Sequence, residues 1–144
     1  ADRVVGWFDA RGAQHVRAGH QGIVPWTAIH VPAANTRATI TQASAGPGVR
    51  NVCTALTVVL AAGATAPTAI NLQVNLIDGA TGGTTYLWRS TISLPATAGT
   101  MNGIALSGLW FVGTAATGMT LEFSAAGGAN TIESVSMTGV TVAE

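Results

Sequence analysis

The residues best suited to bind a metal ion lie near the start of the chain. They are Asp9, His15, His20 and His30, and imidazole and carboxylate groups are ordinary zinc ligands. Their spacing is irregular and glycines lie between them, so no helix or strand is expected to bring them onto one face. The pattern favours histidines that contact solvent or a partner protein, with a metal site as the alternative. We therefore expect no metal ion and no cofactor.

Two acidic residues could form the acid–base pair of a hydrolase. Glu122 and Glu133 lie in consecutive predicted strands with a Gly-rich turn between them, so they could face each other across a β-ladder as in a glycosidase. Glu122, however, alternates with Leu121 and Phe123, which directs its side chain outward on the simplest interpretation. We therefore predict two surface carboxylates, either of which could pair with Arg89.

Other catalytic signatures are missing from the sequence. It contains no Gly-x-Ser-x-Gly nucleophile elbow, no Gly-x-x-x-x-Gly-Lys phosphate loop, no Gly-x-Gly-x-x-Gly fingerprint and no His-Glu-x-x-His motif. Its single cysteine, Cys53, cannot form an intrachain disulfide and lies in an apolar stretch. We predict a protein that is not an enzyme and has no catalytic residues.

The cations and aromatics of the first 34 residues predict contacts with a protein. Six Arg balance six acidic residues and no basic-aromatic interleaving occurs, so we expect no nucleic-acid binding. Arginine forks hold carboxylates well, and exposed tryptophans are common interface anchors. The predicted partner-binding residues are Arg3, Trp7, Phe8, Arg11, Arg17 and Trp26.

The composition also indicates extensive protein contacts. Charged residues make up 8% of the 144 residues, there is no Lys, and the formal net charge is zero, whereas a typical soluble domain is roughly one quarter charged. Interface cores are depleted in Lys and Glu and keep Arg and aromatics. A GC-rich genome, which favours Ala, Gly and Arg codons, would give a similar composition, and the two explanations are compatible.

The clearest structural element is a β-hairpin over residues 68–94. Ile70, Leu72, Val74 and Leu76 alternate with carboxamide residues, as in a half-buried strand. Glycines follow at positions 79, 82 and 83, and a second alternating run then extends over residues 86–94. The turn residues and the two alternating runs predict an antiparallel pair.

Similar runs predict an all-β fold, a two-sheet antiparallel sandwich that is jelly-roll-like with about eight strands. No amphipathic helix is expected. We place a β-sandwich domain at residues 35–144 and an extended N-terminal arm at residues 1–34, where prolines and glycines break any period. The further strands are predicted at residues 37–42, 51–61, 104–112 with a bulge near Ser107-Gly108, 119–124 and 132–142, with a short strand at 29–31.

The arm has too few apolar side chains to be held by their burial alone. Seven large ones contribute on the order of 10–20 kcal/mol, while ordering some thirty residues costs roughly 1–2 kcal/mol each. Its backbone must therefore find hydrogen-bond partners on a sheet edge of its own body or on another chain. The most apolar window, residues 52–62, is too short to cross a membrane. The chain opens with Asp2 and Arg3 rather than an apolar run, so we expect no signal peptide.

The body resembles small virion structural proteins of tailed bacteriophages. The similarity lies in the sequence pattern of strands and turns over about two-thirds of the chain, residues 51–142, and not in a catalytic motif. The segments that carry it are residues 51–56, 66–72, 76–83, 87–88, 93–99 and 119–127.

This resemblance implies a jelly-roll capsid decoration (cement) protein on the outside of a phage head. Such proteins sit as dimers or trimers across joints between major capsid protein subunits and oppose the pressure of packaged DNA. The expected partners are the major capsid protein and further copies of the chain, as a homodimer or homotrimer, with no nucleic acid or membrane. The resemblance implies no catalytic residues. In decoration proteins the arms and sheet edges are the usual capsid contacts, so the same parts of this chain are the expected ones.

Two other functions stay open. Jelly rolls also serve as lectin domains, so a tail-fibre or tail-tip module that binds a receptor or carbohydrate is the alternative. A small hydrolase would require Glu122 and Glu133 to lie about 5–10 Å apart in a cleft. Copy number on the particle distinguishes a cement protein from a receptor-binding module, because a cement protein covers the head and a receptor-binding module occurs at the tail.

Overall fold

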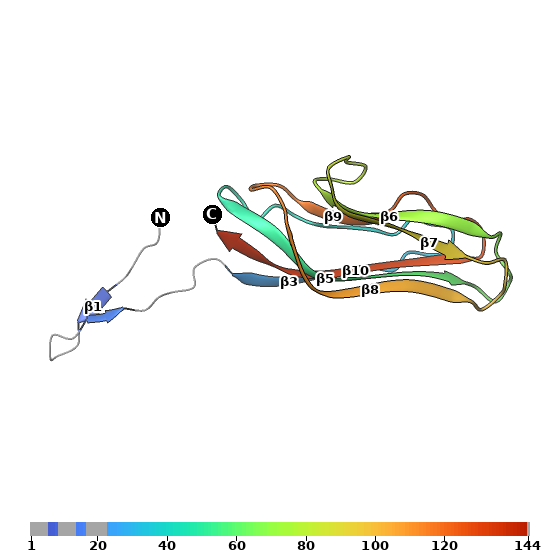
Figure 1. The fold of residues 1–144 in the computed structure, drawn as a ribbon, viewed down its shortest axis with the longest axis horizontal. Coiled ribbons are helices and arrows are strands. Elements are labelled where there is room, and N and C mark those ends of the chain that lie inside the picture. Colours follow the sequence, from blue (N-terminus) through green and yellow to red (C-terminus); the bar gives the residue numbers. More distant parts are fainter. Residues whose placement is uncertain (1–5, 9–13, 17–22, 144) are drawn as a thin grey trace.

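The computed structural model is a β-sandwich without helices in its described part. It describes residues 6–8, 14–16 and 23–143, the first two ranges as backbone only. The all-β jelly-roll prediction is confirmed (Figure 1). The strands of the sandwich are β3 (Val24–His30), β4 (Thr39–Gln42), β5 (Val49–Ala62), β6 (Ile70–Asp78), β7 (Tyr86–Leu94), β8 (Met101–Val112), β9 (Met119–Phe123) and β10 (Thr131–Ala143).

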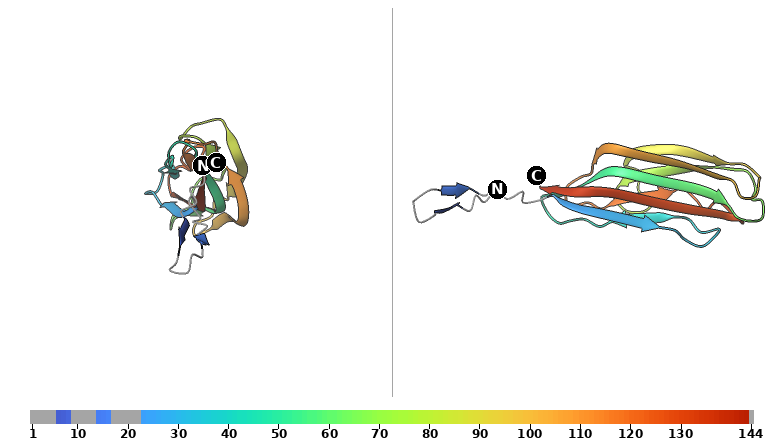
Figure 2. Two further views of the ribbon diagram at one scale, coloured as in Figure 1. Left: turned by 90° about the vertical axis from the view of Figure 1, so that its left-hand side faces the viewer. Right: turned by 90° about the horizontal axis from the view of Figure 1, so that it is seen from below.

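Two four-stranded antiparallel sheets form the layers. The first sheet has the order β3-β10-β5-β8 and the second sheet the order β4-β9-β6-β7. Most neighbours in these sheets are distant in the sequence and consecutive strands often change sheet, which is the double Greek-key arrangement of a jelly roll. In the end-on view and the view from below, the strands run along the long axis of the body (Figure 2).

The predicted hairpin is confirmed as β6 and β7. Ile70 pairs with Leu94 and Leu76 with Trp88. Leu72, Val74 and Leu76 are buried, as the alternation predicted. The connecting turn contains two glycines with positive φ, Gly79 at 142° and Gly82 at 77°, a conformation that side chains with a Cβ rarely adopt.

The hydrophobic core lies between the two sheets. Each strand contributes apolar side chains on its inner face, and each such side chain stabilises the fold by about 1.5–3 kcal/mol when fully buried. The largest of them are Leu56, Leu60, Leu76, Leu94, Met119, Leu121, Phe123 and Met137.

A bulge interrupts the first sheet where the sequence predicted one. The register between β5 and β8 shifts between Cys53 and Ala55, opposite Phe111 and Ser107. Gly108 lies in this irregularity with φ at 68°. The register between β5 and β10 also shifts near Thr138 and Gly139. Bulges increase local twist and redirect side chains.

Residues 24–30, which lie within the predicted arm, form the edge strand β3. This strand pairs antiparallel with β10, with Trp26 opposite Gly139 and Ile29 opposite Ser136. It is longer than the short strand expected at residues 29–31. Two further strands of the arm range, β1 (Gly6–Phe8) and β2 (Gln14–Val16), pair with each other. The division into an arm and a body at residue 34 stays a prediction.

Candidate functional site

The predicted partner-binding residues fall into three groups. Arg3, Arg11 and Arg17 lie outside the described residues. Trp7 and Phe8 lie in β1, where only the backbone is described. Trp26 is the one whose side chain is described, and a role of these residues in binding a partner stays a prediction.

The side chain of Trp26 packs inward against its own domain. It is half-buried in β3 and contacts the core cluster. Its ring lies where a Cβ on Gly139 would be, so the glycine makes room for the indole. The indole Nε1 is buried and has no hydrogen-bond partner in the described part of the chain. A buried N–H group without a hydrogen-bond partner lowers the stability of the fold. The position of the ring is therefore best explained by its packing against the core and Gly139.

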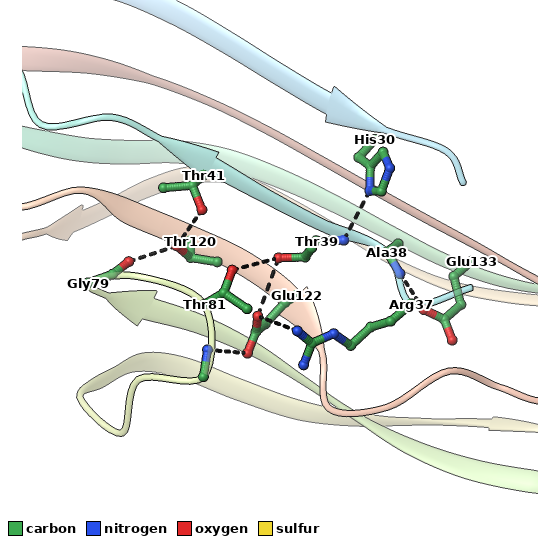
Figure 3. A network of polar contacts seen from close by, with 11 residues as sticks. His30, Arg37, Ala38, Thr39, Thr41, Gly79, Thr81, Thr120, Glu122 and Glu133 are labelled. Carbon is green, nitrogen blue, oxygen red and sulfur yellow. Dashed lines mark hydrogen bonds and ion pairs between the residues drawn. The ribbon is translucent and has the colours of Figure 1, made fainter. Parts of the chain in front are cut away.

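Glu122 is buried, so the prediction of a surface carboxylate at this position is wrong. The residue is 3% exposed in β9. Its Oε1 accepts a hydrogen bond from the backbone N–H of Gly82 at 3.1 Å. Its Oε2 accepts one from the Thr39 hydroxyl at 3.3 Å and lies 3.8 Å from the Arg37 guanidinium. Figure 3 shows these groups converging on the carboxylate from two segments, residues 37–39 and the loop between β6 and β7.

The loop between β6 and β7 is what buries Glu122. The side chain does face away from the core, as alternation predicted, but residues 79–85 fold back over this part of the second sheet (Figure 3). The Thr120 hydroxyl donates to the carbonyl of Gly79 at 2.7 Å, and the hydroxyls of Thr39 and Thr81 lie 3.3 Å apart. The loop therefore supplies the polar partners that a desolvated carboxylate needs.

Glu133 is also buried, at 1% exposure, so the surface prediction is wrong here too. It lies in β10 on the same side of the strand as Val135 and Met137, which belong to the core. Its Oε2 accepts a hydrogen bond from the backbone N–H of Ala38 at 2.7 Å. Its Oε1 is buried without a hydrogen-bond partner of good geometry among the described residues.

Burial raises the pKa of Glu133 above its ordinary value. Interactions with the backbone of Ala38 and Gly127 and with the charge of Arg37 lower it, but burial is the larger effect. Protonation would turn the carboxylate into a neutral group that can donate one hydrogen bond.

The two carboxylates do not form a hydrolytic site. Glu122 lies under the loop on the outer side of the second sheet, whereas Glu133 points from the first sheet toward Ala38, just before β4 (Figure 3). Both are held by backbone N–H groups of the protein itself. A glycosidase needs its two carboxyl groups to flank a substrate. In this protein each carboxyl group instead accepts a hydrogen bond from a backbone N–H group.

His30 is the one histidine whose side chain the structure describes. The Nδ1 atom of His30 accepts a hydrogen bond from the backbone N–H of Thr39 at 3.1 Å, linking β3 to β4. Among the residues that the structure describes, no three His, Cys, Asp or Glu side chains are grouped to hold a metal ion. Asp9, His20 and the side chain of His15 lie outside this part. The described chain has no helix of the length and apolarity needed to cross a membrane.

The outer surface of the second sheet is polar. Exposed Asn71 and Gln73 on β6 pair across the ladder with exposed Ser93 and Thr91 on β7. On the same hairpin, the guanidinium of Arg89 donates to Asn75 Oδ1 at 2.9 Å and lies 3.9 Å from the centre of the Tyr86 ring. This surface offers hydroxyl, amide, guanidinium and aromatic groups together.

The outer surface of the first sheet is different, because its central part contains no charged side chain. One row across the four strands consists of Ile29, Ser136, Thr57 and Ala105. The next consists of Thr27, Thr138, Ala55 and Ser107. We call these two rows and their outward-facing neighbours the uncharged face. Arg50 lies at one end of it and donates to the carbonyl of Gly113 at 3.4 Å.

Comparisons with known proteins give only distant likenesses. No protein-family model and no curated protein matches the chain. A solved structure from Desmodium yellow mottle tymovirus has a TM-score of 0.41 and 8% identity, with 89% of this chain and 91% of that chain covered. A structure of infectious bursal disease virus, Gx strain, has a TM-score of 0.33 and 18% identity, with 96% of this chain and 36% of that chain covered. The jelly-roll assignment rests on the strand order of the two sheets.

Proposed function

We propose that this chain is a non-enzymatic virion structural protein. In this proposal it is a decoration protein that binds the outside of a tailed-phage head across neighbouring major capsid protein subunits. The observation that carries the proposal is the distribution of charge. The carboxylates that could have done chemistry are buried in structural contacts, and the central part of the first sheet's outer surface has no charged side chain, as the core of a protein interface does.

The proposed mechanism is mechanical. A rigid sandwich that touches several subunits adds many weak contacts, and their combined free energy opposes separation of those subunits. No turnover is needed. Residues 1–23 directly precede β3 in the sequence, so contacts made by the predicted arm would begin at an edge of the first sheet. The resemblance to phage virion proteins in residues 51–142 supports the same function.

Labelled protein on intact particles tests the proposal. Electron micrographs are expected to show the label at regular positions over the whole head. Label restricted to the tail would contradict it. A deletion of residues 1–22 tests the arm, since it keeps β3 and therefore the complete first sheet. This variant is expected to fold and to lose head binding, and retained binding would exclude the arm as a capsid contact.

A receptor- or carbohydrate-binding module at the tail is the second candidate. The polar outer surface of the second sheet favours it, because hydroxyl and carboxamide groups beside an aromatic ring suit sugar hydroxyls and sugar faces. Binding to a glycan array that is lost in Tyr86→Ala and kept in Thr57→Ala, on the opposite sheet, would support this function. A location on the head without glycan binding would argue against it.

A further inference from the structure

The uncharged face is open in the described structure. The view from below shows β8, β5, β10 and β3 side by side, with no other described strand in front of them (Figure 2). Alternation decides which side chains are presented, since Val58, Val135 and Met137 point into the core and their neighbours Thr57, Ser134 and Ser136 point away from it.

Exposed apolar groups lie at several places on this face. Ile29 on β3 is 64% exposed and Met101 on β8 is 68% exposed. Ile132, opposite Ala61 on β5, is 37% exposed. The side chains between them are mostly small, so the surface lacks the long charged side chains that keep sheet surfaces apart in solution. Burying such a surface gains free energy from its apolar groups and requires that its hydroxyl groups find hydrogen-bond partners.

The chemistry of the face limits its occupant. A partner with charged groups would bury them with no counter-ion, because the central rows have none to offer. A suitable partner surface is flat, uncharged and able to pair hydroxyl groups. The same face on a second copy has these properties, and because each hydroxyl of Thr27, Thr57 or Ser136 can both donate and accept, identical sets can satisfy one another.

The size of the face also suits a dimer. At about 3.3 Å per residue along a strand and about 4.8 Å between strands, the full length of the four strands covers roughly 700 Å², including the end that carries Arg50. A standard stable interface buries about 800 Å² on each partner. The outer surface of the first sheet is therefore of the size that a standard interface covers.

We propose that the first sheets of two copies pack face to face through their uncharged faces, forming a two-fold symmetric dimer. The sheets would lie about 10 Å apart with strand directions within about 30°, as in aligned sandwiches. An isologous contact of this kind closes on itself. The inference deepens the proposed function and rests on it for its biological setting, since a dimer would give the decoration protein two capsid-contacting surfaces.

Sedimentation equilibrium of the isolated full-length chain tests the dimer without any capsid. The wild-type protein is expected to be dimeric at micromolar concentration. Thr57→Arg, in the central row, places like charges in the interface of both copies, which costs several kcal/mol, and the dissociation constant is expected to rise roughly 100-fold or more. Thr91→Arg, on the exposed surface of the second sheet, is the matched control and is expected to remain dimeric.

Circular dichroism and thermal melting of each variant establish that it is folded, and Ala105→Arg in the neighbouring strand replaces Thr57→Arg if that variant does not fold. A monomeric wild-type chain, a trimer, or a dimer that both central arginine substitutions leave intact would each overturn the inference. Capsid binding by a monomeric Thr57→Arg protein would overturn the dimer's role on the head and leave the decoration function standing.

Discussion

Ala38 and Glu133 are 95 residues apart in the sequence and joined by a hydrogen bond of 2.7 Å. The backbone N–H of Ala38, just before β4 in the second sheet, donates to a carboxyl group on β10 in the first sheet. The bond therefore connects the two layers at a point where both groups are buried. Removing the acceptor leaves a buried N–H group unpaired, which costs about 1–3 kcal/mol.

Glu133→Gln is expected to change the pH dependence of stability. Since burial raises the pKa of Glu133 in the folded protein, the carboxyl group binds its proton more tightly when folded than when unfolded. The contribution of this protonation to the free energy of unfolding is fully present below the pKa of the unfolded state, near 4.5. It is lost as pH rises through the pKa of the folded state. Glutamine keeps an acceptor for Ala38 and has no charge.

Urea denaturation of the wild-type and Glu133→Gln proteins at a series of pH values measures this effect. The wild-type free energy of unfolding is expected to fall, relative to that of the variant, as pH rises above 4.5. Parallel curves for the two proteins would show that Glu133 does not titrate differently on folding. Glu133→Ala serves as a comparison, because it removes the acceptor at every pH.

Glu122→Ala is expected to destabilise the protein and loosen residues 79–85. It removes the acceptor of the Gly82 N–H and the Thr39 hydroxyl and leaves Arg37 without its carboxylate. Loss of such a buried network costs about 2–4 kcal/mol. Hydrogen exchange of the loop amides is expected to accelerate together with the fall in stability.

Thr81→Ala is the matched control for that experiment. It removes one exposed hydroxyl contact to Thr39, and surface changes of this kind stay within about 0.5 kcal/mol. Equal destabilisation by Thr81→Ala and Glu122→Ala would mean that the loop is held by its own hydroxyl contacts and not by the carboxylate.

Gly139→Ala is expected to destabilise the first sheet. A Cβ at this position would overlap the carbonyl oxygen of Val52 and the ring of Trp26. Overpacking of this kind costs about 1–3 kcal/mol or more. Thermal unfolding measures the loss. Gly63→Ala is the control, because the nearest atom to its new Cβ, the carbonyl oxygen of Asn130, would be 3.5 Å away. Similar melting temperatures for the two variants would mean that the indole moves aside at little cost.

Cys53 is expected to resist thiol reagents while the protein is folded. Burial raises the pKa of its thiol from 9.0 to about 11, so at pH 8 only about one molecule in a thousand carries the reactive thiolate. Modification by a disulfide reagent should proceed at the rate of unfolding and become fast in denaturant. Rapid reaction of the folded protein would contradict the buried position. Because the folded protein holds the thiol proton more tightly than the unfolded chain, the free energy of unfolding is expected to be unaffected by Cys53 below about pH 9 and to fall as pH rises toward 11.

Local patterns in the sequence predicted most of the strands. The hairpin of β6 and β7 follows from alternation over residues 70–94 and from the turn glycines between the strands. The bulge near Gly108 follows from a break in the same pattern. The order of the strands within each sheet could not be derived in this way, because the pairing of β3 with β10 joins segments about a hundred residues apart.

Prolines explain why β3 was assigned to the arm. Pro25 lies in this strand and Pro32 follows it closely, and prolines ordinarily indicate a break in a regular strand pattern. A proline is tolerated at a sheet edge, where one side of the strand needs no N–H donor. Pro25 indeed lies on an edge strand, opposite Val140 of β10.

The prediction of surface positions fails for Glu122 and Glu133 for different reasons. Glu133 shares its side of β10 with Val135 and Met137, so alternation within that strand was a usable sign of burial. No comparable sign existed for Glu122, which does point away from the core. It is buried by residues 79–85, and the path of that loop depends on contacts with Thr39 and Thr120 in other strands.

β10 has β3 on one side and β5 on the other, although the ribosome synthesises both long before it reaches β10. During translation, the inner edges of β3 and β5 therefore have no partner in the first sheet until residues 131–143 have emerged. Long-range pairing of this kind slows folding and exposes apolar strand edges to other chains. A nascent polypeptide stalled before residue 131 would thus be a natural target for chaperones.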